Sequence, residues 1–164
     1  KKPVSRFNEL FNYALKKGYS IILDSNLSNV NLAIQNIERL IKRGYNIHIY
    51  YLYNYPKVCF EYATRREVVT HRKVPKEIFV KSNFNSYNTV LEIKSLFKES
   101  INLHFIDKRN DTFYQNIDDN FIKNKIGVDF EFNDQLMKNA LIRINETVKY
   151  TDDNIEKEYA FLVS

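Results

Sequence analysis

The sequence is poor in cysteine and has no long apolar run. It contains one cysteine, Cys59, among 164 residues, which excludes an internal disulfide and a cysteine-based zinc cluster. Cys59 lies in an apolar helical pattern, and we interpret it as a small buried hydrophobic side chain. No run approaches the roughly 18 apolar residues of a membrane-spanning helix. We therefore expect no membrane span, and a cytoplasmic setting fits the low cysteine content.

Glycine is scarce as well. The chain has three glycines, and the phosphate-binding pattern GxxxxGK[ST] does not occur in it. That pattern places backbone N–H groups and a lysine around the phosphates of a nucleotide. The chain begins Lys1-Lys2-Pro3, with neither an initiator Met nor a signal peptide. We expect it to be a piece of a longer protein whose missing part lies upstream.

The composition is otherwise that of a globular domain. With 44% hydrophobic and 15% aromatic residues, a chain of this length is expected to bury one core. The tyrosines and phenylalanines fall mostly at core spacings, which favours packing over base stacking. The formal net charge of +5 permits an anionic partner such as a nucleotide or a nucleic acid without requiring one.

The periodicity predicts helices alternating with strands. The first apolar strand is expected at residues 19–23, buried on both faces, and a second at 45–53. Proline at position 56 suits the first turn of a helix. Helices are predicted at 5–17, 29–43, 56–69, 76–99 (with a break near 83–88) and 134–148, a third strand at 101–106, a turn at 108–111, a hairpin strand at 112–117 and a surface turn or short helix at 152–158. This order predicts an α/β fold, a parallel sheet with flanking helices.

Asp24 is the first candidate site residue. It ends the predicted strand at 19–23 and is followed by Ser25 and Asn26. Ligands of open α/β sheets bind beyond the carboxyl ends of the strands, where a carboxylate is able to orient an acceptor hydroxyl. The alternative is that Asp24 caps the next turn.

Three arginines form the second group of candidates. Arg65 and Arg66 lie late in a predicted helix, where a positive charge also suits the helix dipole. Arg72 lies in the following loop, beside His71, where the dipole gives no reason for it. Planar guanidinium groups stabilise the charge of a transferring phosphoryl group, and Arg65 and Arg72 are spaced to close over one as a lid. The other histidines, His48 and His104, are interpreted as strand residues, with His48 buried.

Four segments together resemble the zeta-toxin-type P-loop kinases. These are a strand and polar turn (ILDSNLSN, 22–29), a helix-to-strand passage (LIKRGYNIHIYYL, 40–52), an arginine-bearing lid region (EYATRREVVTHRKVPKE, 61–77) and a final strand with its turn (INLHFIDKRNDTFYQ, 101–115). The resemblance covers roughly residues 7–117, in the family's order. We therefore take 1–117 as the kinase body and 118–164 as a C-terminal helical extension of the same domain.

The resemblance implies a function. Zeta toxins transfer a phosphoryl group from ATP, with Mg²⁺, to a hydroxyl of UDP-N-acetylglucosamine. By this resemblance Asp24 falls where the family has a substrate-contacting Glu, and Asn26 and His71 occupy neighbouring substrate-binding positions. Arg65 and Arg72 fall on the lid arginines, which implies both a catalytic and an ATP-binding role. No metal-ligand set is assigned to this chain.

The resemblance also implies a P-loop kinase-like fold without its P-loop strand, which in the family lies between the strands expected here at 19–23 and 45–53. We expect no kinase activity from the isolated chain. One alternative is a non-catalytic module that binds nucleic acid or an acidic protein through clustered basic residues, namely Lys42, Arg43, Arg65, Arg66, Arg72 and Lys73. Another is that an antitoxin or other protein chain covers an open sheet edge.

Overall fold

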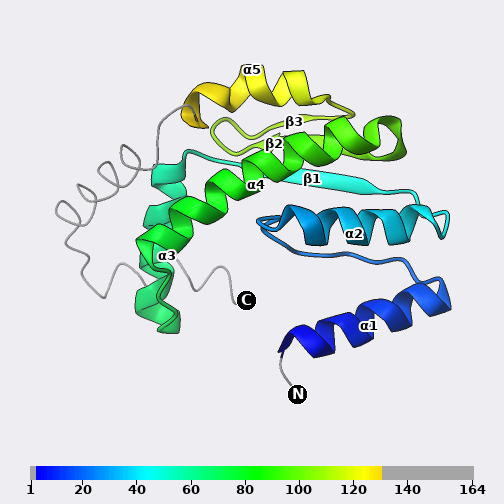
Figure 1. Ribbon diagram of the computed structural model, residues 1–164. Helices are drawn as coiled ribbons and strands as arrows, with labels where there is room; N and C mark the ends of the chain where they lie inside the picture. Colours follow the sequence, from blue (N-terminus) through cyan, green and yellow to red (C-terminus); the bar gives the residue numbers. More distant parts are fainter. Residues whose placement is uncertain (1–2, 131–164) are drawn as a thin grey trace.

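The computed structural model describes residues 3–130 and places a small sheet against a layer of helices (Figure 1). The elements follow the chain in this order: α1 (Pro3–Lys17), α2 (Val30–Ile41), β1 (His48–Tyr53), α3 (Pro56–Thr70), α4 (Lys76–Phe97), the 3₁₀ turn η1 (Lys98–Ser100), β2 (Asn102–Asp107), β3 (Thr112–Tyr114) and α5 (Asp119–Phe130). The predicted α/β architecture is confirmed.

The sheet has three strands in the order β1-β2-β3. β1 and β2 are parallel and pair in register from His48 opposite Asn102 to Tyr53 opposite Asp107. The connection between them runs through α3 and α4, as parallel strands require. β3 returns antiparallel to β2, which confirms the hairpin expected after the turn at 108–111.

Helices cover one face of the sheet. The inward side chains of β1 and β2, such as Tyr51 and Phe105, pack with Val90 of α4 and Ile126 of α5 in the larger core cluster. A second cluster joins α2 and α4 to Ile47 and Ile101, the residues just before β1 and β2. α4 is the central element of this layer, since it packs against both α2 and α5. It runs unbroken, so the break predicted near 83–88 is wrong; its face is fixed by Val80, Val90 and Ile93, all at most 1% exposed.

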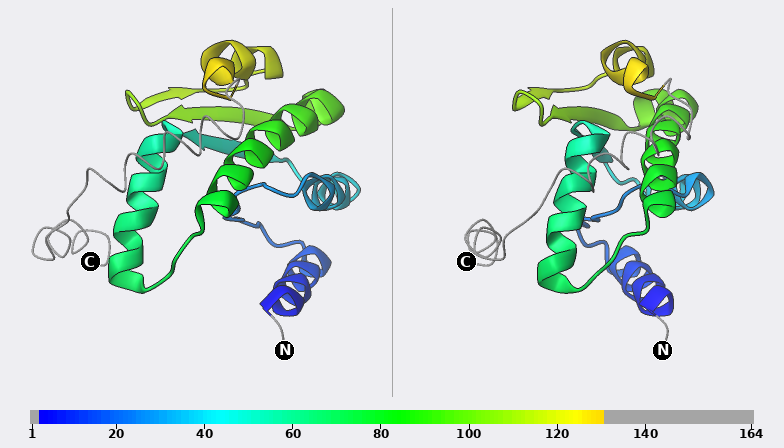
Figure 2. Two further views of the ribbon diagram at one scale, coloured as in Figure 1. Left: turned by 60° about the vertical axis from the view of Figure 1, so that its left-hand side comes forward. Right: turned by 90° about the vertical axis from the view of Figure 1, so that its left-hand side faces the viewer.

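The opposite face of the sheet carries exposed apolar side chains, and Figure 2 shows the β2–β3 hairpin extending away from α2 and α4. Tyr50 is 54% exposed, Leu52 62% and Phe113 49%. His104 is buried beneath the Tyr50 ring, and its Nε2 lies 3.0 Å from Nδ1 of His48. The expectation that His48 is buried is wrong, because it stands on this bare face and is exposed.

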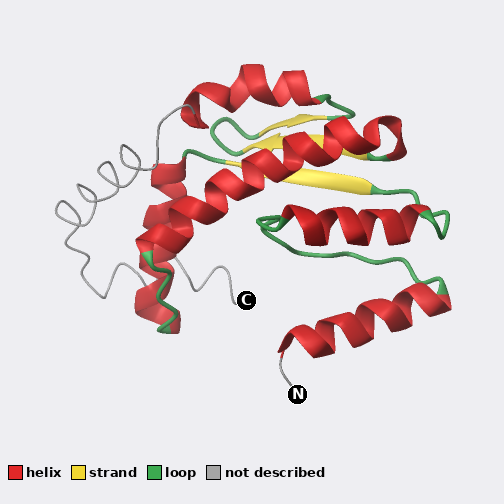
Figure 3. Ribbon diagram, viewed as in Figure 1, coloured by secondary structure: helices red, strands yellow, loops and turns green. Residues whose placement is uncertain are grey.

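The strand predicted at 19–23 is not formed, and residues 19–29 are loop (Figure 3). An apolar run forms a strand only when a neighbouring strand takes its backbone hydrogen bonds, and none of the described strands lies beside this one. The segment is held at one end by the Tyr45 hydroxyl, which donates to the Tyr19 carbonyl oxygen at 2.9 Å. Ile22 in its middle is fully exposed.

Residues 118–164 are described only in part. The helical extension expected at 118–164 was given no helix at the bounds of α5; Ile122, Ile126 and Phe130 bury one side of this helix. The helix expected at 134–148 and the turn expected at 152–158 lie outside the described residues. No helix among residues 3–130 is both long and apolar enough to cross a membrane.

Candidate functional site

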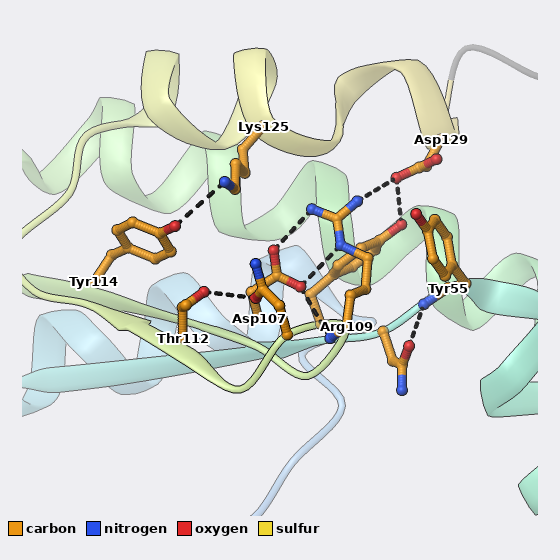
Figure 4. A network of polar contacts seen from close by, with 10 residues as sticks. Tyr55, Asp107, Arg109, Thr112, Tyr114, Lys125 and Asp129 are labelled. Carbon is orange, nitrogen blue, oxygen red and sulfur yellow. Dashed lines mark hydrogen bonds and ion pairs between the residues drawn. The ribbon is translucent and has the colours of Figure 1, made fainter.

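The carboxyl ends of β1 and β2 bring a group of polar side chains together (Figure 4). Tyr53 and Asp107 are the last residues of the two strands and lie opposite each other in the parallel register. The turn after β2 adds Arg109, and α5 adds Asp129. We call Tyr53, Tyr55, Asp107, Arg109 and Asp129 the carboxyl-edge network. This edge of a parallel sheet is where α/β proteins bind their ligands.

Asp107 and Arg109 form the centre of the carboxyl-edge network. Arg109 Nε donates to Asp107 Oδ1 and Nη2 donates to Oδ2, both at 2.8 Å, the paired geometry typical of guanidinium and carboxylate. The Asp107 side chain is 1% exposed. Hydrogen bonding to Arg109 lowers the pKa of Asp107, and the same bonds raise the pKa of Arg109. The pair therefore stays ionised and fixes the turn after β2.

The other side of Arg109 faces α5 and two tyrosines. Its Nη1 lies 3.4 Å from Asp129 Oδ2, and the Tyr53 hydroxyl donates to that same oxygen at 2.6 Å. The guanidinium carbon lies 4.9 Å from the Tyr53 ring centre and 5.2 Å from that of Tyr55, within cation–π range. Burial, followed by the bond to Asp129, raises the pKa of Tyr53, so this phenol remains a hydrogen-bond donor at neutral pH.

This arrangement offers a ligand two kinds of group. Tyr55 is 48% exposed and gives an aromatic surface beside the guanidinium. The Asp129 carboxylate, whose side chain is 25% exposed, is an acceptor for a hydroxyl. Sequence reasoning missed the network. An aspartate ending a strongly apolar strand and followed by an arginine in the turn was the signal for Asp107 and Arg109, whereas nothing in the sequence connects Asp129 to them.

Asp24 and Asn26 lie in the exposed loop between α1 and α2. Asn26 Oδ1 accepts from the Ser28 backbone N–H at 3.1 Å, and Ser25 Oγ accepts from the Leu27 N–H at 3.1 Å. Two short polar turns thus give the loop its local shape. No hydrogen bond or ion pair joins Asp24 or Asn26 to His71 or Arg72, so no polar interaction links these four candidates in the structure.

Arg65 and Arg72 lie on α3 and on the loop after it. Arg65 is partly buried, and its Nη2 donates to Glu61 Oε1 at 2.9 Å. α3 ends at Thr70 and is capped by His71, which takes a left-handed conformation with φ 54°, and Arg72 follows as an exposed side chain. A hollow of about 150 Å³ lies between α3 and this loop, lined by Thr64, Glu67 and Lys73 among others. Neither Arg65 nor Arg72 is among the residues that line this hollow.

A comparison with known protein families covers most of the helices and strands described above. A family model described as Zeta toxin matches residues 4–119. The chain belongs to the zeta toxin family. No curated protein and no solved structure matches it. The matched residues include the predicted site residues and both strands of the carboxyl edge, whereas Asp129 lies beyond the match.

Zeta toxins are in general ATP-using, kinase-like proteins, and the residues of this chain fit part of what ATP requires. Arg65 and Arg72 suit phosphate oxygens, because guanidinium groups donate paired hydrogen bonds. The chain does not supply the rest of a phosphate site, since GxxxxGK[ST] is absent from its sequence. Residues 3–130 contain no cluster of three or more His, Cys, Asp or Glu side chains spaced to hold a metal ion. This zeta toxin chain therefore has arginines whose chemistry suits phosphate and lacks the sequence pattern of a phosphate cradle.

Proposed function

We propose that this chain is the acceptor-binding and lid portion of a zeta-toxin kinase that phosphorylates a hydroxyl of a nucleotide sugar such as UDP-N-acetylglucosamine. The observation that carries the proposal is the family match over residues 4–119, which contains Asp24, Asn26, Arg65, His71 and Arg72. ATP with Mg²⁺ supplies the phosphoryl group when bound. The cradle for its phosphates comes from polypeptide other than these 164 residues, because the sequence has no phosphate-binding loop.

The chain's own residues have separate roles in this proposal. Asp24 accepts a hydrogen bond from the acceptor hydroxyl and orients it, and Asn26 and His71 bind the polar groups around it. Arg65 and Arg72 neutralise charge on the transferring phosphoryl group, where an arginine contributes about 10³–10⁵-fold to rate in related phosphoryl transfer. Arg72 is suited to this role because it is exposed and forms no ion pair with a described carboxylate.

The open edge of the sheet and the exposed loop at 19–23 support the proposal that further polypeptide adds a strand to this sheet. β1 is an edge strand, and its outer backbone groups are open to pairing. The exposed loop at 19–23 keeps Ile22 and Leu23 in solvent, although apolar runs of this kind are normally buried. One additional strand between β1 and this loop satisfies both. Its source in our proposal is a P-loop-bearing segment, and an antitoxin chain is a candidate cover for the exposed Tyr50 and Leu52.

The test joins a strand, P-loop and helix from a zeta toxin to the N-terminus of this chain. The isolated chain and the fusion are each incubated with ATP, Mg²⁺ and UDP-N-acetylglucosamine, and phosphorylated sugar is measured by mass spectrometry. We expect product from the fusion only. Arg72→Ala in the fusion is expected to lower the rate by about 10³-fold or more. Arg66→Ala, which removes an exposed arginine of α3 just before the Arg72 loop, serves as the matched control.

Two results contradict the proposal. One is ATP hydrolysis or sugar phosphorylation by the isolated chain. The other is a folded fusion that binds ATP and phosphorylates no nucleotide sugar. Equal rate losses in Arg66→Ala and Arg72→Ala would remove the specific role given to Arg72.

A further inference from the structure

We propose that the C-terminal ends of α1 and α2 form a binding surface for single-stranded nucleic acid. The surface consists of four cations and two aromatic rings, and we call it the basic–aromatic patch: Tyr13, Lys16, Lys17, Tyr19, Lys42 and Arg43. This inference is independent of the proposed kinase function.

The net charge of the whole chain is concentrated at this place. Residues 11–20 and 39–48 contain five lysines and arginines and neither aspartate nor glutamate. Since the chain has 25 basic and 20 acidic residues in total, the remaining residues carry 20 of each and are neutral as a set. A positive potential of this kind attracts a polyanion.

The fold brings the two stretches into contact. Arg43 Nη1 donates to the Leu15 carbonyl oxygen at 3.0 Å, which joins the end of α2 to the end of α1. The Tyr45 hydroxyl donates to the Tyr19 carbonyl oxygen just beyond α1, and Arg39 contacts Asn12 within the two helices. Figure 1 shows both helices ending on the same side of the molecule. The patch is therefore one surface.

The lysines of the patch are available to a ligand. Lys16, Lys17 and Lys42 are exposed, and none of them forms an ion pair with a described carboxylate. The helix dipole accounts for one or two cations at each C-terminus. It gives no reason for two exposed tyrosines among them.

Those tyrosines determine the kind of polyanion. Tyr13 and Tyr19 are each 53% exposed, and their rings lie 6.2 Å apart in an edge-to-face arrangement. Lys17 Nζ lies 5.9 Å from the centre of the Tyr13 ring. Exposed rings interleaved with cations suit single strands, because unstacked bases stack on the rings while phosphates meet the lysines. A duplex keeps its bases stacked on each other and offers only its phosphates.

The patch lies at the opposite end of the sheet from the carboxyl-edge network. Tyr45 precedes β1, whereas Tyr53 ends it, so the two surfaces are separated by the length of the strand. The basic cluster expected from sequence is not assembled, because Lys42 follows α2 while Arg65 and Arg72 belong to α3 and its loop, on the other side of Figure 1. Binding at the patch is thus measurable without disturbing the proposed kinase residues.

The experiment measures binding of fluorescein-labelled U20 and dT20 to the 164-residue chain by fluorescence anisotropy between 50 and 200 mM salt. Four cation–phosphate contacts predict a slope of log affinity against log salt of about −3, equivalent to a roughly 50-fold loss over this range. Lys17→Gln with Lys42→Gln is expected to reduce the slope to about −1.4. Lys57→Gln with Lys81→Gln, two exposed lysines on α3 and α4, removes the same charge and is expected to leave the slope unchanged.

A second pair of variants tests the base stacking. Tyr13→Leu with Tyr19→Leu is expected to weaken oligonucleotide binding by about fivefold or more and to leave binding of inorganic polyphosphate unchanged. Equal losses from the two lysine pairs would overturn the proposal, since net charge alone would then explain binding. Polyphosphate or duplex DNA binding as tightly as U20, or tyrosine variants that bind like the wild type, would overturn it as well. Circular dichroism of each variant checks that the fold is kept.

Discussion

Removal of the Arg109 side chain tests whether the carboxyl-edge network holds the fold at the end of the sheet. Arg109→Ala leaves the Asp107 carboxylate 1% exposed and without its two 2.8 Å partners. It also removes the guanidinium from the Tyr53 and Tyr55 rings. The remaining donor to Asp107 is the Arg109 backbone N–H at 3.1 Å, which is too little to solvate a buried charge.

The expected loss is large because a buried carboxylate loses its partner. Removing one member of a buried ion pair costs about 3–5 kcal/mol. Arg109 retains 18% exposure of its side chain, which admits some water and favours the lower end, about 3 kcal/mol. For a chain of this size each 1 kcal/mol corresponds to about 2–4 °C in Tm, so the variant is expected to melt about 6–12 °C below the wild type.

The assay is urea unfolding monitored by circular dichroism, with the double variant Asp107→Asn, Arg109→Leu as the control. The double variant removes both charges and is expected to recover at least half of the loss, because it leaves no uncompensated carboxylate. If Arg109→Ala loses less than about 1 kcal/mol, or if the double variant is as unstable as the single one, the pairing argument is wrong.

Three further predictions concern the sheet and its faces. Burial, and then the neighbouring His48, lower the pKa of His104 in the folded chain. Because the unfolded chain then binds more protons, the free energy of unfolding is expected to fall as the pH drops below about 6.5. Urea midpoints measured between pH 5 and 7.5 for the wild type and for His104→Asn check this dependence. Phe105→Ala removes a fully buried ring of β2 and is expected to cost about 3–5 kcal/mol, measured by the same unfolding. Ile22→Asp changes a fully exposed side chain and is expected to alter the stability of the isolated chain by less than about 0.5 kcal/mol. The same change is expected to reduce the kinase activity of the P-loop fusion. A large loss of stability in the isolated chain would show that the loop at 19–29 is already packed.

Several elements were predictable because their signals are local. Gly18 and Gly44 follow helices and adopt φ values of 68° and 73°, the left-handed conformation in which glycine terminates helices. Pro56 starts α3 where its missing N–H carries no cost. β2 is an apolar run whose residues Leu103 and Phe105 are fully buried, and such a run is read directly from sequence.

The two main failures have a common cause, which is dependence on distant chain. The run at 19–23 has the composition of a buried strand, yet a strand needs a neighbour for its backbone groups, and the described chain offers none. Asp129 completes the carboxyl-edge network from α5, 20 residues after Arg109 in sequence. Its position depends on how α5 packs through Ile122 and Ile126, and no local pattern reports that packing.

The distribution of buried side chains connects stability to the proposed function. The two largest core clusters lie between the sheet and the layer of α2, α4 and α5, so this side of the domain is complete by itself. Asp24 follows the exposed run at 19–23, and the open edge of β1 is available on the other side. Under the proposed function, one inserted strand would bury Ile22 and Leu23 and, by ordering the segment before Asp24, would also fix the carboxylate that orients the acceptor. Completion of the sheet and assembly of the catalytic site are then a single event, because the same backbone hydrogen bonds produce both.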